Sequence, residues 1–471
     1  MATKGEILDG RRPGADLLLD GYRYTKRPVN KSGTLPWRCH SQITKCPASV
    51  TTTVDGTVLR RGKDHTHPPD QSGDAGARIL LDNMRKRSRE ELTSIPKIYE
   101  EERMKLLSGY EDDTPQEIAA KLSMYGGIKS GLYRQRAKKV PKTPQAAMDL
   151  HLEGEWTMTE MGGDFVIVDD VRDGSRILVF GTLSDLTRLC NSDTASMDGT
   201  FKICPKIFYQ LYVIHSHQSH GSVPELFCLL PDKKTSTYHR LISLLKLKAA
   251  DLELKFDPTT LIVDFELTVH NVVRDLLPTT NIKGCLFHFG QALYRNLQGL
   301  GLASLYKTSD DVRKWFRMYI GLAFLPVAHV VEGYNLVVAH TPDVSQCYIF
   351  NQYFNNTWIN GQFPLSVWNH FRSDNPRTNN SCEGYNSRLS KRAMKPHLNI
   401  YELILLFKSE NANKEAHLLQ IESGQKQTKR RRVREDRDKL FQLGLDYVTC
   451  NRSMAAYLSA CGAVLAGTFP V

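Results

Sequence analysis

The stretch SMDGTFKICPKIFYQLYVIHSHQSHGSVPELFCLL, residues 196–230, decides the fold of this chain. It contains three runs typical of β-strands, Ser196–Ile203, Phe208–His215 and Leu226–Leu230, at the short spacing of consecutive hairpins. Downstream, Leu261–Val263 is typical of a short buried strand, and a helical pattern follows it. Three antiparallel strands followed by alternating helices and strands predict one mixed sheet with helices on its faces.

The composition of the whole chain is that of a globular protein with two or three domains. Its 471 residues are 41% apolar and 24% charged, which argues against a disordered chain. No stretch approaches the ~20 uncharged apolar residues of a membrane helix, and the first residues do not resemble a signal peptide. The 10 cysteines are too few for a disulfide scaffold. We therefore expect an intracellular protein with reduced thiols and no membrane partner.

The net charge of +11 is unevenly distributed. Residues 1–150 and 426–471 are basic, whereas residues 151–425 are close to neutral. Basic flanks around a neutral centre predict a polyanionic partner, and nucleic acid is the first candidate. The alternative is that the positive charge only favours solubility. The densest basic cluster, Lys429–Arg432, suits nuclear import or phosphate contact, with a solvated helix face as the alternative.

Four side chains of the types that bind zinc lie near the N-terminus: Cys39, Cys46, His65 and His67. They belong to residues 17–69, where alternating strand patterns and the Asp55-Gly56 turn predict a small β-rich module. So small a module buries too little apolar surface to fold without a further stabilising element such as a bound metal ion. Two thiolates and two imidazoles suit tetrahedral zinc, so we predict a structural Zn²⁺ site. The alternative is two buried thiols and two surface histidines.

The same module resembles the FLYWCH-type zinc finger. The resemblance is carried by Gly21-Tyr22-x-Tyr24, Trp37-x-Cys39, Cys46 and His65-x-His67. It implies that the two cysteines and two histidines are the zinc ligands and that the module binds DNA or protein. His40 lies outside the pattern and is not assigned as a ligand.

Three carboxylates lie at points where the predicted sheet would bring them together. Asp198 lies on the first strand of the meander, Asp264 ends a buried strand, and Glu383 begins a later helix. Taken singly, each has a structural explanation, as part of a hairpin turn, a helix cap or a capping box. Taken together, three oxygen donors predict a site for two Mg²⁺ or Mn²⁺ ions that serve phosphoryl transfer.

This part of the chain resembles the MULE (Mutator-like element) transposase domain, a member of the RNase H-like DDE superfamily. The matching motifs are Asp198-Gly199-Thr200-Phe201, Val263-Asp264-Phe265-Glu266, Cys285-x-x-His288 and Thr378-Asn379-Asn380-x-x-Glu383-Gly384. The resemblance implies Asp198, Asp264 and Glu383 as catalytic residues and as ligands of Mg²⁺ or Mn²⁺. Cys285 and His288 are candidate accessory residues, with a structural role beside the site as the first interpretation and metal binding as the second.

Several other polar and aromatic side chains receive structural interpretations. Glu266 is expected on a helix, pointing away from Asp264. Three histidines, His215, His217 and His220, are expected in a hairpin turn that is exposed to solvent. Two tryptophans, Trp358 and Trp368, are expected in the hydrophobic core, with stacking on a nucleobase as the alternative role.

The predicted fold class is α/β: an RNase H-like mixed sheet with a helical insertion, behind a small β-rich zinc finger and a helical linker region. The predicted parts are an N-terminal tail at 1–16, the finger at 17–69, a helical, basic linker or accessory DNA-binding region at 70–150, the catalytic core at 151–299 and 376–395, the helical insertion at 300–375, and a C-terminal helical and basic tail at 396–471.

We therefore predict a nuclear DNA transposase that cleaves and joins strands at transposon ends, as a homodimer or larger assembly. Its cofactors would be structural Zn²⁺ and catalytic Mg²⁺ or Mn²⁺, and its partners transposon ends and target DNA. One alternative is a domesticated, catalytically silent zinc-finger regulator. Others are a nuclease that cleaves without joining and a finger that binds protein rather than DNA.

Overall fold

The structure is a computed structural model that describes residues 3–9, 15–41, 45–71, 73–91, 93–108, 114–218, 221–373, 380–393, 395–425 and 431–465. The chain divides into two compact units, residues 1–142 and residues 143–471. Among the described helices, none combines the length and apolar character that a membrane span requires.

The first unit begins with an antiparallel sheet whose strands follow one another in chain order. These strands are β1 (Glu6–Asp9), β2 (Ala15–Leu19), β3 (Tyr22–Lys26), β4 (Leu35–Cys39), β5 (Ser49–Thr52) and β6 (Val58–Arg61). Their alternating side chains bury a small core around Trp37, whose indole N–H donates to Thr52 Oγ1 at 2.8 Å. β1 pairs with β2. The sheet thus begins within residues 1–16, which the sequence suggested to be a tail.

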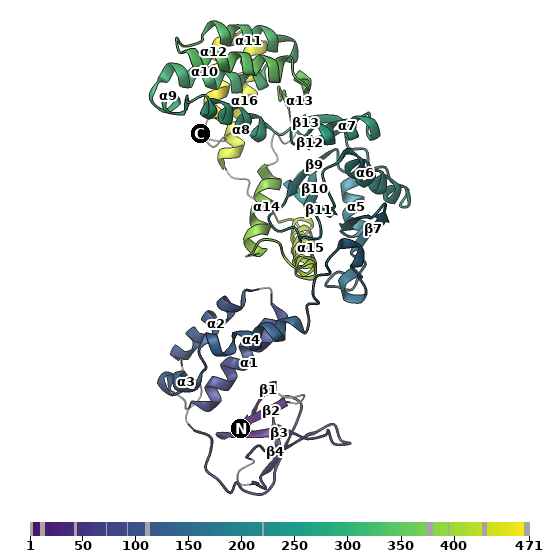
Figure 1. Ribbon diagram of the computed structural model, residues 1–471, viewed down its shortest axis with the longest axis vertical. Helices are drawn as coiled ribbons and strands as arrows, with labels where there is room; N and C mark the ends of the chain where they lie inside the picture. Colours follow the sequence, from purple (N-terminus) through teal and green to yellow (C-terminus); the bar gives the residue numbers. More distant parts are fainter. Residues whose placement is uncertain are drawn as a thin grey trace. The chain divides into compact units, whose positions relative to one another are not determined.

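Four helices complete the first unit: α1 (Asp74–Glu90), α2 (Ile95–Met104), α3 (Pro115–Lys121) and α4 (Tyr125–Ala137) (Figure 1). Met84, Ile98 and Leu132 join α1, α2 and α4 in one small core. Gly73, just before α1, has a φ of +85° and lies so close to Glu117 that a Cβ would clash with its carbonyl oxygen. Only glycine meets both conditions without strain.

The second unit is built on a seven-stranded sheet in the order β13-β12-β9-β10-β11-β8-β7. The strands are β7 (Val166–Arg172), β8 (Ser175–Phe180), β9 (Thr194–Thr200), β10 (Gln210–Gln218), β11 (Gly221–Leu230), β12 (Thr260–Val263) and β13 (Asn281–Gly284). β9, β10 and β11 are antiparallel, whereas β12 runs parallel to both β9 and β13. The predicted mixed sheet is confirmed, and its near-continuous apolar strands reflect burial on both faces.

Helices cover both faces of this sheet (Figure 1). On one face lie α5 (Leu183–Cys190), α6 (Thr235–Ala250) and α7 (Leu267–Leu276), which share an apolar core with the strands. On the other lie α14 (Asn380–Ala393) and α15 (Ile400–Glu422), and the ring of Phe407 on α15 stacks on that of Phe227 on β11 with centroids 4.4 Å apart. Asn399 caps α15, and together with Glu402 it forms a capping box after the Lys395-Pro396 break.

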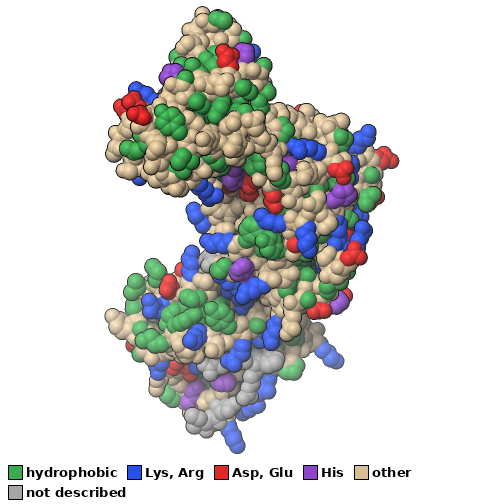
Figure 2. Space-filling model, turned by 45° about the horizontal axis from the view of Figure 1, so that its top comes forward, with side chains coloured by type: hydrophobic (Ala, Val, Ile, Leu, Met, Phe, Trp, Pro, Cys, Tyr) green, Lys and Arg blue, Asp and Glu red, His purple; other side chains and the backbone are tan. Residues whose placement is uncertain are grey.

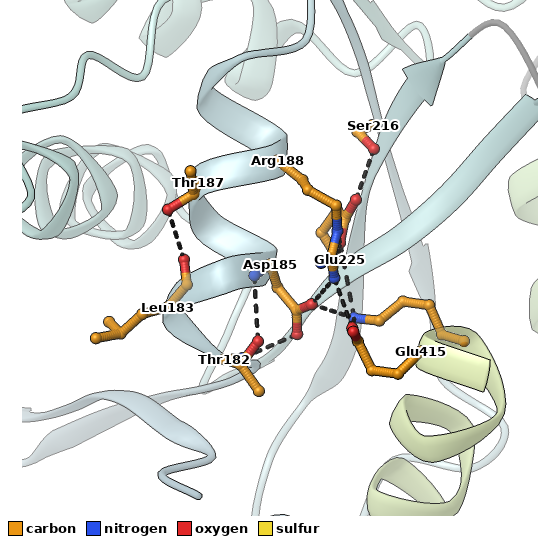
Figure 3. Close-up of polar contacts among 9 residues, drawn as sticks. Thr182, Leu183, Asp185, Thr187, Arg188, Ser216, Glu225 and Glu415 are labelled. Atoms are coloured by element: carbon orange, nitrogen blue, oxygen red, sulfur yellow. Dashed lines mark hydrogen bonds and ion pairs between the residues drawn. The ribbon is translucent and has the colours of Figure 1, made fainter. Parts of the chain in front are cut away.

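A buried ion-pair cluster attaches α15 to the sheet (Figure 3). Asp185 on α5 and Glu225 on β11 are fully buried, and Arg188 and Lys414 contact both carboxylates. Asp185 also completes the capping box of α5. Removal of one partner would leave a buried charge uncompensated, so loss of a single side chain from this cluster is costly.

The remaining helices of the second unit form a separate aromatic-rich cluster. They are α8 (Leu286–Gly299), α9 (Ala303–Thr308), α10 (Asp310–Gly321), α11 (Val330–Ala339), α12 (Ser345–Phe354), α13 (Leu365–Trp368), α16 (Arg431–Val448) and α17 (Met454–Leu465). Their core contains Trp315, Tyr319 and Trp368 together with Leu458 and Cys461 of α17. The C-terminal helices, which the sequence suggested to be a tail, thus share a core with the helices of the predicted insertion.

Candidate functional site

The four predicted zinc ligands lie together at one end of the first unit's sheet. Cys39 ends β4, Cys46 precedes β5, and His65 and His67 follow β6. One ligand atom from each lies within 4.8 Å of all the others. His67 Nε2 is 3.1 Å from Cys39 Sγ, and His65 Nδ1 is 3.5 Å from Cys46 Sγ. Ligand atoms of tetrahedral zinc lie about 3.3–3.8 Å apart, so the cluster fits structural Zn²⁺.

In each histidine, the ring nitrogen that does not face a cysteine has a polar partner of its own. His67 Nδ1 lies 2.7 Å from the Pro68 carbonyl oxygen, to which it donates, and this leaves Nε2 as the metal-binding atom. His65 Nε2 lies 2.7 Å from the Tyr24 hydroxyl, while the ring of Tyr22 stacks on the His65 imidazole at 3.5 Å. Such partners fix the tautomer and orientation of metal-binding histidines.

The three predicted carboxylates come from three separate elements of the second unit. Asp198 lies on β9, opposite Val213 of β10, and is only 7% exposed. Asp264 directly follows β12, which is parallel to β9. Glu383 lies in the first turn of α14. Because the carboxyl ends of parallel strands meet at one edge of a sheet, Asp198 and Asp264 line the same small cavity, of about 90 Å³.

His288, in the first turn of α8, joins two of these acids. Its Nδ1 lies 2.6 Å from Asp264 Oδ1, and its Nε2 lies 3.2 Å from Glu383 Oε1. The Cys285 thiol, at the N-cap of the same helix, lies within 4.8 Å of the Asp264 and His288 ligand atoms. The Cys-x-x-His motif therefore lies within the acidic cluster itself.

The cluster places several acidic side chains in a partly buried environment, which shifts the pKa values of two of them. Burial, and then the neighbouring Asp264, raise the pKa of Asp198 to about 7. Burial also raises the pKa of Glu383. Burial alone would lower the pKa of His288, but the adjoining Asp264 carboxylate outweighs it and raises that pKa to about 11. The imidazolium thus acts as a counter-ion to the acids.

Several buried polar atoms of the cluster contact one another through ion pairs. Among the described residues, Asp264 Oδ1, His288 Nδ1 and Glu383 Oε1 have no hydrogen-bond partner beyond these ion-pair contacts. Buried polar atoms that are only partly satisfied call for an explanation, and a bound ion is one such explanation. Oxygen donors of this kind suit hard divalent cations such as Mg²⁺ and Mn²⁺.

Two residues that the sequence did not assign also reach the site. Asn386, one turn after Glu383 on α14, donates to Asp198 Oδ2 at 2.7 Å. Lys233 lies 3.7 Å from Glu266 Oε2 at the wall of the cavity. The spacing Glu383-x-x-Asn386 would have indicated that both side chains face one side of a helix.

Two structural interpretations made from the sequence are wrong. Glu266 does not point away: it is the N-cap of α7, with extended backbone, and it lines the cavity with Asp198 and Asp264. His215 is not exposed, because β10 extends to Gln218 and buries its ring, and burial lowers its pKa to about 3. His217 is largely buried as well, and burial lowers its pKa to about 4. His220 lies outside the described residues.

The core interpretation of the two tryptophans is confirmed. Trp358 is 3% exposed and Trp368 is fully buried, where its indole N–H donates to the Trp358 carbonyl oxygen. Neither ring presents a face to solvent, so neither is available for stacking on a base. Residues 378–379 of the Glu383 motif and residues 429–430 of the basic cluster lie outside the described residues.

Comparison with known families agrees with this arrangement. Residues 194–292 match the model of the MULE transposase domain, and residues 7–67 match that of the FLYWCH zinc finger domain. The chain combines a FLYWCH zinc finger with a MULE transposase domain. No curated protein was found to match the chain. The two domains indicate a transposase-like protein that binds DNA, and zinc binding follows from the FLYWCH domain and its four clustered ligands.

Proposed function

We propose that this protein is a DDE-type DNA transposase in which Asp198, Asp264 and Glu383 are the catalytic acids. The observation that carries the proposal is that Asp198 and Asp264 line one small cavity, while His288 lies between Asp264 and Glu383 of α14. Perturbed pKa values clustered in a cleft are typical of functional sites.

The sheet topology supports an RNase H-like core. Its five strands in the order β13-β12-β9-β10-β11 combine an antiparallel meander with two parallel strands on one side. This is the arrangement implied by the resemblance of the sequence to the DDE superfamily. β8 and β7 extend the sheet beyond β11.

The proposed roles follow from the position of each side chain. Asp198, Asp264 and Glu383 would hold two Mg²⁺ or Mn²⁺ ions, which when bound activate the attacking hydroxyl and stabilise the leaving oxygen of a phosphodiester. Asn386 orients the Asp198 carboxylate through its hydrogen bond. His288 holds a proton at Nδ1 or Nε2 beside two of the acids and limits their mutual repulsion.

We further propose that the first unit binds DNA through residues that are not part of the catalytic site. A cavity of about 490 Å³ between α1 and α4 is lined by Arg85, Arg134 and Lys138, by Gly and Ser residues, and by Leu and Ile side chains of both helices. Its three cations suit a phosphate backbone. The face drawn in Figure 2 also carries many Lys and Arg side chains with acidic ones scattered between them. We also propose that the protein is nuclear and that it acts as a homodimer or a larger assembly.

The test is metal-dependent strand cleavage and joining by the purified full-length chain. Its substrate is DNA that carries the ends of the element encoding the protein, incubated with Mg²⁺ or Mn²⁺. Joined products that require the metal and disappear in Asp264→Asn support a transposase. Cleavage without joining supports a nuclease instead.

One observation favours the second candidate, a catalytically silent DNA-binding regulator. The His288 imidazole already neutralises part of the acidic cluster, with ring nitrogens 2.6 Å and 3.2 Å from two of the acids. Specific DNA retention that depends on Cys39, without any cleavage in either metal, would establish this candidate.

A further inference from the structure

Two aromatic side chains lie at the ends of the loop that joins β9 to β10. Phe201 is 42% exposed and Tyr209 is 52% exposed, and their rings meet edge to face with centroids 5.5 Å apart. Single exposed aromatic residues are common on protein surfaces, so exposure by itself decides nothing. Their position is what distinguishes this pair.

Phe201 lines the cavity that holds Asp198 and Asp264. It follows Asp198 by only three residues, at the point where β9 ends and the chain leaves the sheet. An exposed ring therefore adjoins the place where the scissile phosphate would lie.

The loop is held by backbone hydrogen bonds at both ends. The Tyr209 N–H donates to the Leu230 carbonyl oxygen at 2.9 Å, and the His397 N–H donates to the Lys202 carbonyl oxygen at 2.8 Å. These bonds hold the backbone beside both rings. An ordered backbone lowers the entropic cost of binding.

A cation lies beside the aromatic pair. Lys233 Nζ is 4.8 Å from the centroid of the Phe201 ring and 3.7 Å from Glu266 Oε2. It therefore lies between the Phe201 ring and the Glu266 carboxylate, in the lining of the cavity. A nucleotide has matching parts, a flat base and an anionic phosphate, and base–aromatic stacking with basic side chains is how proteins hold single strands.

We propose that Phe201 and Tyr209 form a subsite that stacks one unpaired nucleobase next to the scissile phosphate, with Lys233 contacting the backbone of that nucleotide. The inference rests on the proposed function, because it takes Asp198 and Asp264 as the place of phosphoryl transfer. The base must be unpaired, since a base within a duplex already has both faces stacked.

The experiment measures base stacking directly. The full chain, with Ca²⁺ in place of Mg²⁺, is mixed with a forked DNA that carries 2-aminopurine at its first unpaired position, and with a fully paired duplex of the same sequence. The variants are Phe201→Ala, Tyr209→Ala and Phe201→Trp. Tyr348→Ala on α12 is the matched control, because Tyr348 is 51% exposed and lies outside the cavity lining.

We expect 2-aminopurine fluorescence to be quenched by the unmodified protein, by Tyr348→Ala and by Phe201→Trp. In Phe201→Ala and Tyr209→Ala the quenching should disappear, with affinity for the fork falling roughly 10- to 100-fold while affinity for the duplex is unchanged. Unchanged melting temperatures of these variants exclude loss of the fold as the cause.

Equal quenching in all variants overturns the subsite, and so does an equal loss of affinity for fork and duplex. Cleavage with Mg²⁺ is measured on the same preparations. Cleavage without selective quenching refutes the subsite and leaves the transposase intact, whereas selective quenching without cleavage refutes the enzyme and keeps the base-binding subsite.

Discussion

Asn386 Nδ2 donates a hydrogen bond to Asp198 Oδ2 over 2.7 Å, although 188 residues separate the two in the chain. This contact ties α14, which carries Glu383, to the strand β9 beneath it. A second contact, between Ser196 Oγ on β9 and Cys382 Sγ on α14 at 3.0 Å, holds the same two elements together.

Asn386→Ala should raise the pKa of Asp198, because the amide donor stabilises the ionised carboxylate. Protons compete with cations for a carboxylate below its pKa, so Mn²⁺ binding to the variant should weaken at higher pH than in the unmodified protein. Calorimetric Mn²⁺ titrations at several pH values measure this. An unchanged pH dependence with a uniformly lower affinity would show that Asn386 acts only on the fold.

Asp264→Asn should reduce cleavage by roughly 10³-fold or more, because a neutral amide is a poor ligand for a hard cation. Gel analysis of end-labelled DNA measures the rate. Asp275→Asn is the control, since Asp275 lies on α7 with its side chain 69% exposed and should leave cleavage unchanged. Equal activity of the Asp264 variant and the control would refute the assignment.

Cys39→Ser should lose bound zinc and the β1–β6 sheet together. The small core around Trp37 cannot stabilise the sheet alone, whereas structural zinc contributes on the order of 10 kcal/mol. Metal analysis and the dispersion of backbone NMR signals measure the two losses. His40→Ala is the control, because the His40 ring nitrogen lies 3.0 Å from Thr25 Oγ1 and outside the ligand cluster. It should keep both the metal and the sheet.

Lys414→Ala should destabilise the second unit by about 3–5 kcal/mol, because Asp185 and Glu225 would lose a buried counter-charge (Figure 3). Glu415→Ala should cost about 1 kcal/mol or less, since the Glu415 side chain is 41% exposed. Urea unfolding of the two variants measures the difference. Similar losses of unfolding free energy in both variants would contradict the role of Lys414 as the buried counter-charge.

Acid should destabilise the second unit through its two buried histidines. The pKa of His215 in the folded protein is about 3 and that of His217 about 4, below the 6.5 of an exposed histidine. Between those values the unfolded chain binds more protons, so the full stability is present above pH 6.5 and falls as the pH drops towards 4. Each neutral ring contributes on the order of 3 kcal/mol to the pH-dependent part of the free energy of unfolding. His217→Gln should therefore reduce the dependence of that free energy on pH, which urea unfolding at several pH values measures.

Much of the architecture was predictable because short-range patterns report it. The meander 196–230 and the run Leu261–Val263 predict their strands from alternation, apolar content and turn spacing, and the structure contains those strands. The zinc ligands were predictable for a similar reason, since four ligands lie within 29 residues, Cys39 to His67, of one small module.

Other features could not be read from local patterns. His215 looked like a turn residue, because the sequence does not show where β10 ends. Glu266 looked like a helical residue, because one position decides whether a side chain caps a helix or lies within it. The pairing of α17 with α10 in one core joins segments more than a hundred residues apart, and no periodicity reports such a pairing.

Local sequence patterns indicated which strands and helices form and which residue types can bind metals and DNA, because helices, strands and turns depend on neighbours within a few positions. The folded structure was needed to show that Asp198 and Asp264 line one cavity, that His288 lies between Asp264 and Glu383, and that Phe201 rather than a tryptophan lies beside the cavity. Such distances depend on how the strands pair and how α8 and α14 pack, which is a property of the whole folded chain.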